Sequence, residues 1–340
     1  MDKELTVGKL LDKTGNLKEC GFSYSFIKDY NRKDIKGMKT RIKEWDYYEF
    51  NNEDYGIALT VADNSYMSLV SVSFMDFKYK KFITKSIMKP FTFGKVKLPS
   101  SSIKGDIIYE GKDFSFKFLN DGTERRLICS YKNFTKYSDF NCDLRIYETC
   151  PKSMVIATPF KKDRHFYYNQ KINNLICNGY FIIGEKRYPM EEALGVLDWG
   201  RGVWTYNNTW YWSSCSYKDK DGVTKGFNLG YGFGDTSAAS ENMVFLGKEA
   251  YKLNDVQFLI PRDVKGNYNY LDTWKVVSEN GDINLTFTPI LDRHDDTNLY
   301  LLCSLQHQVF GKFNGEIKYK RKTIKFNDAI GFAERVTNKW

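Results

Sequence analysis

The sequence lacks the long apolar segments on which membrane and secreted proteins depend. Its first residues, MDKELTVGKLLDKTG, contain no apolar stretch of signal-peptide length, and no run approaches the roughly 18 apolar residues that span a bilayer. The seven cysteines are scattered, odd in number and without a CxxC pair, so reduced thiols are expected rather than a disulfide framework. These absences predict a cytoplasmic protein without stable membrane insertion.

Histidine is scarce, and cofactor motifs are missing. His165, His294 and His307 show no HxH, HxxxH or HExxH spacing, so we expect no metal site. The sequence has no phosphate-binding loop and no nucleophile elbow. The alternate glycines of GYGFGDT lack the strand–helix context of a dinucleotide-binding loop. The sequence therefore indicates no cofactor.

Aromatic residues and positive charge are abundant instead. Aromatics make up 16% of the chain, which favours β-structure, and the net charge is +9. Much of this charge lies in residues 78–89 and 318–325, where basic and apolar residues alternate as they do on solvated strand faces. Because no helix-turn-helix or RNA-binding motif accompanies the two runs, we expect no nucleic-acid partner.

Most segments alternate with period two between turn signals, a pattern typical of antiparallel β-structure. Asn280-Gly281, Asn314-Gly315 and Gly247-Lys248 each separate two alternating segments and are predicted hairpin turns, because such residues tolerate positive φ. Helical pattern is limited to residues 190–197, for which we expect one short turn of helix.

The two halves of the chain carry a weak internal repeat. Similar residues recur in the same order at a nearly constant offset, in the pairs Trp45 and Trp210, Asp113 and Asp282, and Cys129 and Cys303. Such a repeat predicts an all-β chain made of two tandem antiparallel β-barrels, residues 1–190 and 191–340. Trp45 and Trp210 should then occupy equivalent strand positions.

Several longer segments carry a family resemblance: RIKEWDYY (41–48), FYYNQKIN (166–173), LGVLDWGRGVW (194–204), GFNLGYGFGDTSAASEN (226–242) and GFAERVTNKW (331–340). Together they closely resemble a bacterial family known as domain of unknown function 2804. That family is similar to two-barrel, lipocalin-like (calycin) proteins, which include carotenoid hydratases of the hydroxyneurosporene synthase type and some polyketide and isoprenoid cyclases. The resemblance implies two tandem lipocalin-like barrels, but it implies no settled activity.

The aromatic segment TWYWSSCS (209–216) is the first candidate site. Alternation places Trp210 and Trp212 on one strand face, and the next segment, GFNLGYGFG, places Asn228 with the glycines and Tyr231 on the opposite face. The glycines either open a cavity lined by the two indoles or leave room for them in a filled core. We favour a cavity in the second barrel, with Asn228 as a partner for an indole N–H.

Acidic and polar residues near this segment supply candidate chemistry. In DWGRG, Asp198 and Arg201 form either a structural ion pair at the rim of the pocket or a site in which a desolvated Asp198 acts as a general acid. Glu241 is a second candidate acid. His307, on an apolar strand face, is either a satisfied core residue or a proton carrier.

The segment FYYNQKIN presents a polar face that carries Asn169 and Lys171. This face suits either a crevice between the two barrels or an exposed sheet surface.

These observations predict a protein that binds an apolar or amphipathic small molecule, with cofactor-independent hydration, isomerisation or cyclisation as the chemistry if it is an enzyme. The alternative is a non-enzymatic carbohydrate-binding or interaction protein. The sequence leaves the oligomeric state open. The candidate catalytic residues are Asp198, Glu241 and His307, and the candidate ligand-binding residues are Trp199, Arg201, Trp204, Trp210, Trp212, Asn228, Tyr231, Asn242, Asn169 and Lys171.

Overall fold

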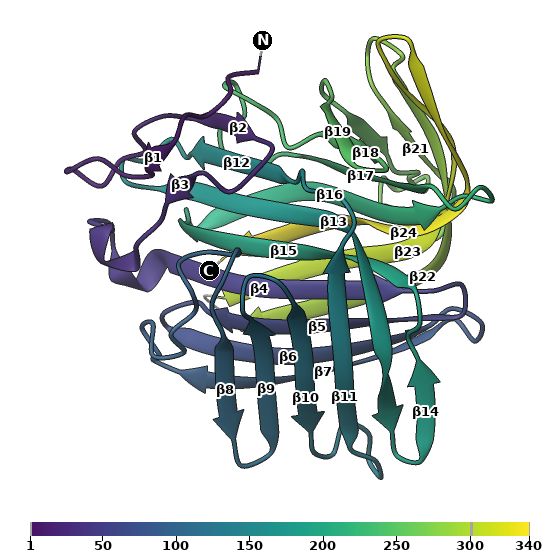
Figure 1. Cartoon of the computed structure of the whole chain (residues 1–340), viewed down its shortest axis with the longest axis horizontal. Coiled ribbons are helices and arrows are strands. Elements are labelled where there is room, and N and C mark those ends of the chain that lie inside the picture. The colour runs from purple at the N-terminus through teal and green to yellow at the C-terminus, as the bar shows by residue number, and fades with distance from the viewer. Residues whose placement is uncertain (1, 300–301, 340) are drawn as a thin grey trace.

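The computed structural model of the chain describes residues 2–299 and 302–339. These residues form β-strands and two short 3-10 helices, η1 (Arg32–Asp34) and η2 (Lys39–Arg41). Within the same ranges, no helix has the length and apolarity needed to cross a membrane. The predicted all-β class is confirmed, and the strands form two curled antiparallel sheets that make two tandem barrels (Figure 1).

The first barrel contains most of the strands in the N-terminal part of the chain. They are β2 (Gly21–Ser23), β4 (Ile42–Asn51), β5 (Tyr55–Asp63), β6 (Met67–Asp76), β7 (Lys81–Pro90), β8 (Ile107–Gly111), β9 (Phe114–Asn120), β10 (Arg125–Tyr131), β11 (Phe140–Glu148), β12 (Met154–Pro159), β13 (Phe166–Ile183), β14 (Lys186–Pro189) and β15 (Ala193–Val203). Their order is β7-β6-β5-β4-β15-β13-β11-β10-β9-β8; β12 and β14 pair with β13, and β2 pairs with β12. In Figure 1, β8–β11 run steeply across the direction of β4–β7, so the sheet curls over its own core. Two further strands, β1 (Gly8–Lys9) and β3 (Lys28–Asp29), form a small parallel pair.

The second barrel follows directly. Its strands are β16 (Asn207–Lys218), β17 (Thr224–Tyr231), β18 (Met243–Leu246), β19 (Glu249–Lys252), β20 (Gln257–Leu259), β21 (Trp274–Val277), β22 (Ile283–Leu299), β23 (Leu302–Tyr319) and β24 (Lys322–Lys339). Their order is β19-β18-β17-β16-β24-β23-β22-β21-β20. In each barrel, the first long strand pairs with the last, β4 with β15 and β16 with β24.

Trp45 and Trp210 occupy equivalent positions, as predicted. Each is the fourth residue of the first long strand of its barrel, and each pairs with the fourth residue from the end of the closing strand, Gly200 in β15 and Val336 in β24. The two tryptophans are equivalent in strand topology and register. Both indole side chains point to the outer face of their barrel.

The other two residue pairs of the predicted repeat are not equivalent. Cys129 lies on β10, which β11 and β13 separate from the closing strand, whereas Cys303 lies on β23, directly beside the closing strand. Asp113 lies in the β8–β9 turn and Asp282 in the β21–β22 turn. Three strands separate β9 from its closing strand β15, whereas one strand separates β22 from its closing strand β24. Short β-segments of similar composition thus recur at a similar spacing without structural correspondence.

Two of the three predicted hairpin turns are confirmed. Gly281, at φ +74°, lies in the turn between β21 and β22, and Gly247, at φ +57°, lies in the turn between β18 and β19. The third prediction is wrong, because Asn314-Gly315 lies inside β23. There the register against β24 shifts between Phe313 and Gly315, because Asn327 and Asp328 of β24 lie opposite Asn314 alone, so the β-bulge is on β24 and Gly315 is a paired residue of β23.

Strand β15 differs from the prediction for the same region. Residues 190–197 do not form a helical turn, because β15 begins at Ala193 and pairs with both β4 and β13. The first sheet therefore continues to Val203, beyond the expected boundary after residue 190, and the second barrel begins at Asn207. Every residue of β15 is buried, so this strand lacks the alternation that marks a strand with one solvent-facing side.

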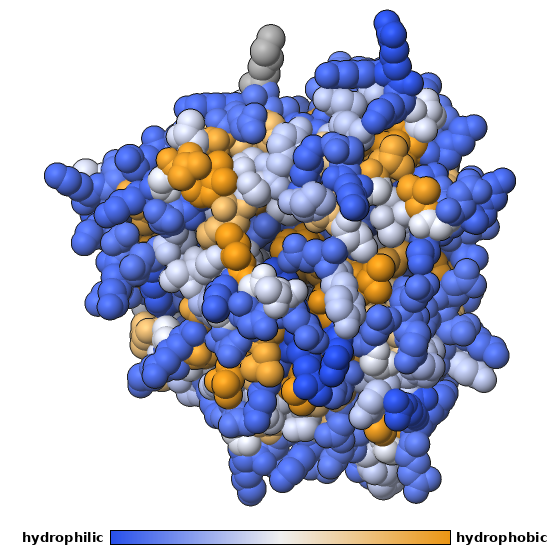
Figure 2. Space-filling model, viewed as in Figure 1, coloured by the Kyte–Doolittle hydropathy of each residue, from blue (hydrophilic) through white to orange (hydrophobic). Residues whose placement is uncertain are grey.

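Apolar side chains are buried in three places. One cluster fills the first barrel, around Phe116 and Leu127, and another fills the second barrel, around Phe287 and Phe313. The remaining clusters mix side chains from both barrels and lie between them. On the face shown in Figure 2, hydrophobic side chains form small separate patches among hydrophilic ones.

We call the layer between the barrels the seam. It is formed by the outward faces of β4, β13 and β15 on one side and of β16, β17, β23 and β24 on the other, with the segments that follow β15 and β17. Its central aromatic residues are Tyr47, Tyr167, Trp204, Trp210, Trp212, Phe233, Phe310 and Phe332. Polar contacts also cross it: Asn173 Nδ2 donates to Ser214 Oγ at 2.8 Å, and Ser216 Oγ donates to the Gly195 carbonyl at 3.1 Å.

Candidate functional site

The seam collects most of the residues that the sequence singled out, although they come from five separate segments. These residues are Asn169, Lys171, Asp198, Trp204, Trp210, Trp212, Asn228, Glu241 and Asn242. Strand alternation explains the arrangement, since side chains two residues apart share a face.

The predicted faces of β13 and β16 are correct, but the expected direction of one of them is not. On β13, Tyr167 faces the seam while Tyr168 belongs to the core of the first barrel, so the polar face of FYYNQKIN lies between the barrels. On β16, Trp212 packs in the seam while Cys215 packs inside the second barrel. Trp210 and Trp212 therefore point away from the second-barrel interior that they were expected to line.

The glycine face of β17 meets the tryptophan face of β16. Gly230 pairs directly with Trp212, and a Cβ added at Gly230 would lie 2.5 Å from Glu241 Oε1. Glycine at this position thus allows the Glu241 carboxyl to approach the strand. Trp212 Nε1 donates to Asn228 Oδ1 at 2.7 Å, as predicted for a buried indole.

Asp198 pairs with Lys171 and not with Arg201. Lys171 Nζ lies 3.1 Å from Asp198 Oδ2 and 3.5 Å from the centre of the Trp212 ring. Asn169 Nδ2 donates to Asp198 Oδ1 at 2.5 Å. The predicted Asp198–Arg201 pair is wrong because residues three apart on a strand point to opposite faces. Arg201 instead points into the first barrel and binds Asp46 at 2.8 Å.

Two buried glutamates lie near this ion pair. Glu334, on β24, accepts hydrogen bonds from Trp210 Nε1 at 2.9 Å and from Gln308 Nε2 at 3.0 Å. Burial raises the pKa of Glu334 to about 7, although these hydrogen bonds and Lys171 oppose the change. Burial also raises the pKa of Glu241, against the favourable charge of Lys171 and a hydrogen bond from Asn228.

Sequence reasoning missed Glu334 and a third buried carboxyl, Glu49. Burial raises the pKa of Glu49 on β4 to about 8, and Asn51 Nδ2 donates to it at 2.9 Å. A signal for Glu334 was available in the segment GFAERVTNKW, because Phe332, Glu334 and Val336 share one strand face. A carboxyl between two apolar neighbours on a single face indicates a buried acid.

Aromatic rings pack around these carboxyls. The ring of Phe233 lies 4.5 Å from that of Trp204, 4.7 Å from that of Tyr167 and 5.3 Å from that of Trp210. Trp45 stacks on Tyr167 with the ring centres 6.0 Å apart. Trp204 Nε1 is buried, and no hydrogen-bond partner for it lies among residues 2–299 and 302–339.

Glu241 and Tyr167 are almost fully buried beside the same groups. Only 8% of the Glu241 surface and 7% of the Tyr167 surface remain accessible to water. Desolvation first, and then the carboxylates of Asp198, Glu241 and Glu334, raise the pKa of the Tyr167 hydroxyl. The seam therefore combines acidic groups, a hydroxyl and an ammonium group in an aromatic enclosure.

The remaining predicted residues lie outside the seam. Trp199 and Arg201 face the first barrel, where Arg201 lies 4.2 Å from the Trp199 ring. Tyr231 stacks on Tyr211 at 4.5 Å on the inner face of the second barrel. His307 Nδ1 donates to Asp292 Oδ2 at 2.8 Å, and its ring stacks on Tyr270 at 3.7 Å.

The described ranges contain no group of three or more His, Cys, Asp or Glu side chains placed to hold a metal ion. The seam groups can instead exchange protons among themselves and with a molecule held against the aromatic rings.

Comparison with known proteins places the chain in a family and matches its fold to solved structures. The family described as "Domain of unknown function (DUF2804)" matches residues 2–340. A protein assigned as AttH from Nitrosomonas europaea shares 12% identity at a TM-score of 0.53, over 90% of this chain and 96% of that chain. Kievitone hydratase from Nectria haematococca shares 11% identity at a TM-score of 0.51, over 88% of each chain. No curated protein sequence matches the chain.

Proposed function

We propose a function for this chain from the premise that it belongs to the DUF2804 family, whose description assigns no reaction. The proposed site is the seam, and the proposed ligand is an apolar or amphipathic small molecule. The proposed chemistry is cofactor-independent acid–base catalysis, as in hydration, isomerisation or cyclisation. The observation that carries the proposal is that two buried carboxyls, Glu334 and Glu241, lie within electrostatic reach of the Lys171–Asp198 pair among aromatic rings.

Glu334 is the proposed general acid. With a pKa of about 7 it is protonated in a large fraction of molecules at neutral pH, whereas an ordinary glutamic acid is ionised there. Its proton would pass to one carbon of a carbon–carbon double bond, leaving a cation on the other carbon. Water then adds to that cation and returns a proton to the Glu334 carboxylate, so the net reaction consumes one water. Loss of a neighbouring proton to the carboxylate gives isomerisation instead.

Aromatic faces stabilise a cation by the attraction of their π-electrons. Trp212 supports this role, because its ring already faces the Lys171 ammonium at 3.5 Å. Asp198 and Asn169 fix the position of Lys171 and are proposed as positioning residues. One of the solved structures with this fold is by name a hydratase, and addition of water is the reaction class that these groups suit.

The carbohydrate-binding alternative would need an open aromatic surface. Trp212 is 5% exposed, and the Trp210 indole N–H is bonded to Glu334. No observation favours that alternative for these two residues.

The test uses Glu334→Gln in the full chain, with Glu110→Gln as the matched control because Glu110 is exposed on β8. Isoprenoid and aromatic alkenes are incubated with each protein in heavy-oxygen water, and label uptake is followed by mass spectrometry. We expect Glu334→Gln to lower the rate about 100-fold or more while tryptophan fluorescence still reports binding. Full turnover by Glu334→Gln would exclude this carboxyl as the acid. Absence of any bound molecule in native mass spectra of protein from its own host, together with no binding across the panel, would overturn the ligand proposal.

A further inference from the structure

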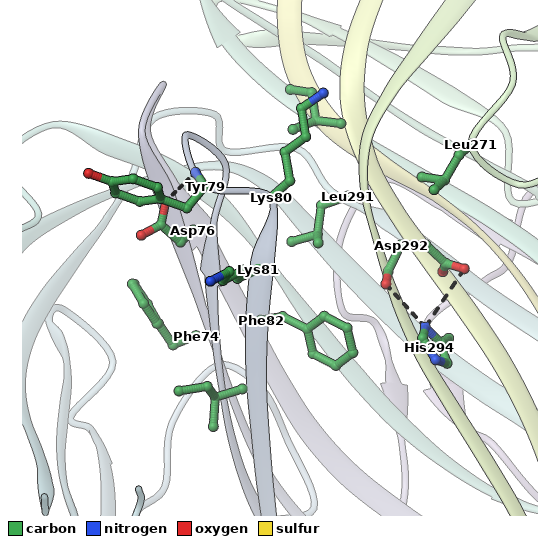
Figure 3. Close-up of a pocket in the computed structure, with 12 residues that line it drawn as sticks. Phe74, Asp76, Tyr79, Lys80, Lys81, Phe82, Leu271, Leu291, Asp292 and His294 are labelled. Carbon is green, nitrogen blue, oxygen red and sulfur yellow. Dashed lines mark hydrogen bonds and ion pairs between the residues drawn. The ribbon is translucent and has the colours of Figure 1, made fainter.

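A second candidate site lies on the surface, outside the group of carboxyls described above. A cleft of about 790 Å³ opens where the β6–β7 hairpin of the first barrel approaches β22 of the second (Figure 3). This volume falls within the range of about 300–1,000 Å³ that is usual for small-molecule sites. Neither Glu334 nor Glu241 lines it.

The body of the cleft is apolar. Half of its lining residues are large apolar side chains: Phe74, Phe82, Ile83, Leu271, Ile290 and Leu291. Phe82 and Leu291 lie in the middle of the view in Figure 3, the first from β7 and the second from β22. Leu271 is 62% exposed at the rim, and burying it against a ligand would be favourable.

Contacts between the barrels hold the two walls together. The Phe82 ring meets the His294 ring edge to face, with the centres 5.7 Å apart. Arg293, beside His294 on β22, donates from Nη1 to Ser73 Oγ on β6 at 2.7 Å. Because both walls are tied in this way, the cleft does not depend on a bound molecule to form.

Two lysines and two aspartates supply the charges at the cleft. Each aspartate accepts a hydrogen bond through one oxygen: Asp76 Oδ1 from the Tyr79 amide at 2.9 Å, and Asp292 Oδ2 from His307 Nδ1 at 2.8 Å. Asp292 Oδ1 is buried without a hydrogen-bond partner among the described residues. Lys80 and Lys81 are exposed at the tip of the hairpin, and neither forms an ion pair within the part of the chain that the structure describes. The ammonium groups of Lys80 and Lys81 are therefore available to an anionic group at the tip of the hairpin.

We propose that this cleft binds an amphipathic anion, that is, an apolar body carrying one acidic group. The apolar body would lie between Phe82 and Leu291, and the acidic group would lie at Lys80 and Lys81. The site stands apart from the seam chemistry, because it uses other residues and needs no proton transfer.

Calorimetric titration of the full chain with decanoate tests the proposal, with decanol and decyltrimethylammonium as neutral and cationic probes of equal chain length. We expect decanoate to bind most tightly, and more weakly at high salt. Replacing both rim lysines, Lys80→Glu and Lys81→Glu, should weaken decanoate about tenfold and leave decanol unchanged. The matched control is Lys85→Glu, an exposed lysine of β7 that does not line the cleft.

A second variant, Leu271→Glu, changes an exposed side chain and should also weaken decanoate without altering the melting temperature. The proposal is overturned if decyltrimethylammonium binds as tightly as decanoate, if the double lysine variant binds like the control, or if decanoate does not bind. Glu334→Gln separates the two sites: we expect it to keep full decanoate affinity, and a loss would place the binding in the seam instead of the cleft.

Discussion

At the scale of single residues, burial sets what the seam carboxyls can do. Burial raises the pKa of Glu334 to about 7 and the pKa of Glu49 to about 8. Asp198, by contrast, is bound by both Lys171 and Asn169. One layer therefore contains carboxyls that can donate a proton beside a carboxylate held by a cation, a division of roles that acid–base enzymes use.

Glu334 should make the protein less stable as pH rises. Its pKa is about 7 in the folded protein and near 4.5 ordinarily, so the unfolded chain loses this proton first. The free energy of unfolding then falls between about pH 4.5 and pH 7 and is level above that range. Glutamine at position 334 is neutral at every pH. Glu334→Gln should therefore reduce the decrease in the free energy of unfolding over this pH range by about 3 kcal/mol. Urea unfolding of both proteins at about pH 5 and pH 8 measures the difference, and an equal pH dependence in both would contradict it.

The sequence identified many seam residues but not their partners. Alternation correctly separated the two faces of β16, yet it could not tell which face lies inside the barrel, because both are buried. It likewise could not pair Lys171 with Asp198, since that contact depends on the register between β13 and β15. Partners across strands are non-local, and a single sequence does not contain them.

At the scale of elements, β15 shows how closely the layers approach. Its inner side faces the first barrel, and its outer side faces the seam. A Cβ added at Gly200 would lie 2.0 Å from Cζ2 of Trp45, its partner on β4. Glycine is needed here because the indole lies flat against the backbone.

Gly200→Ala should therefore destabilise the fold by about 1–3 kcal/mol through overpacking. Trp45→Leu makes room for the added methyl group, so the double variant should be more stable than the sum of the two single effects predicts. Denaturant unfolding of the unchanged protein, the two single variants and the double variant completes this double-mutant cycle. Additive effects would show that the alanine does not meet the indole.

Turns illustrate a similar limit at this scale. The sequence correctly placed the turns at Gly281 and Gly247, but it mistook Gly315, a paired residue of β23 beside a bulge in β24, for a third. Gly315 has the positive φ that the prediction assumed, +133°, but it keeps this φ inside a strand. Only the continuation of pairing between β23 and β24 beyond this glycine shows that it lies within a strand and not in a turn.

At the scale of the whole molecule, the seam joins two barrels into one unit. Its clusters combine Tyr47 and Val196 of the first barrel with Trp212, Phe310 and Phe332 of the second. Separation of the barrels would expose these side chains to water. The duplicated fold was predictable from period-two patterning and repeated turns, but the seam was not, because its contacts join distant parts of the chain.

We therefore expect the two barrels to unfold together. Circular dichroism in the far ultraviolet and tryptophan fluorescence should give coincident transitions on heating or in denaturant. The second barrel alone, residues 207–340, should be poorly soluble because it would expose the Trp212 face. Two separate transitions in the intact chain would show that the seam contributes little to cooperativity.

The pairing of β4 with β15 has a consequence for how the chain folds. Ile42 pairs with Val203, so the first barrel cannot close until nearly all of its strands have been synthesised. During that time β4 has an unpaired edge, and its aromatic residues Trp45, Tyr47, Tyr48 and Phe50 lack their final packing partners, a combination that favours association between chains. Closure through such distant contacts is slow. Yield during expression should thus depend on the synthesis and pairing of β15 more than on any local turn.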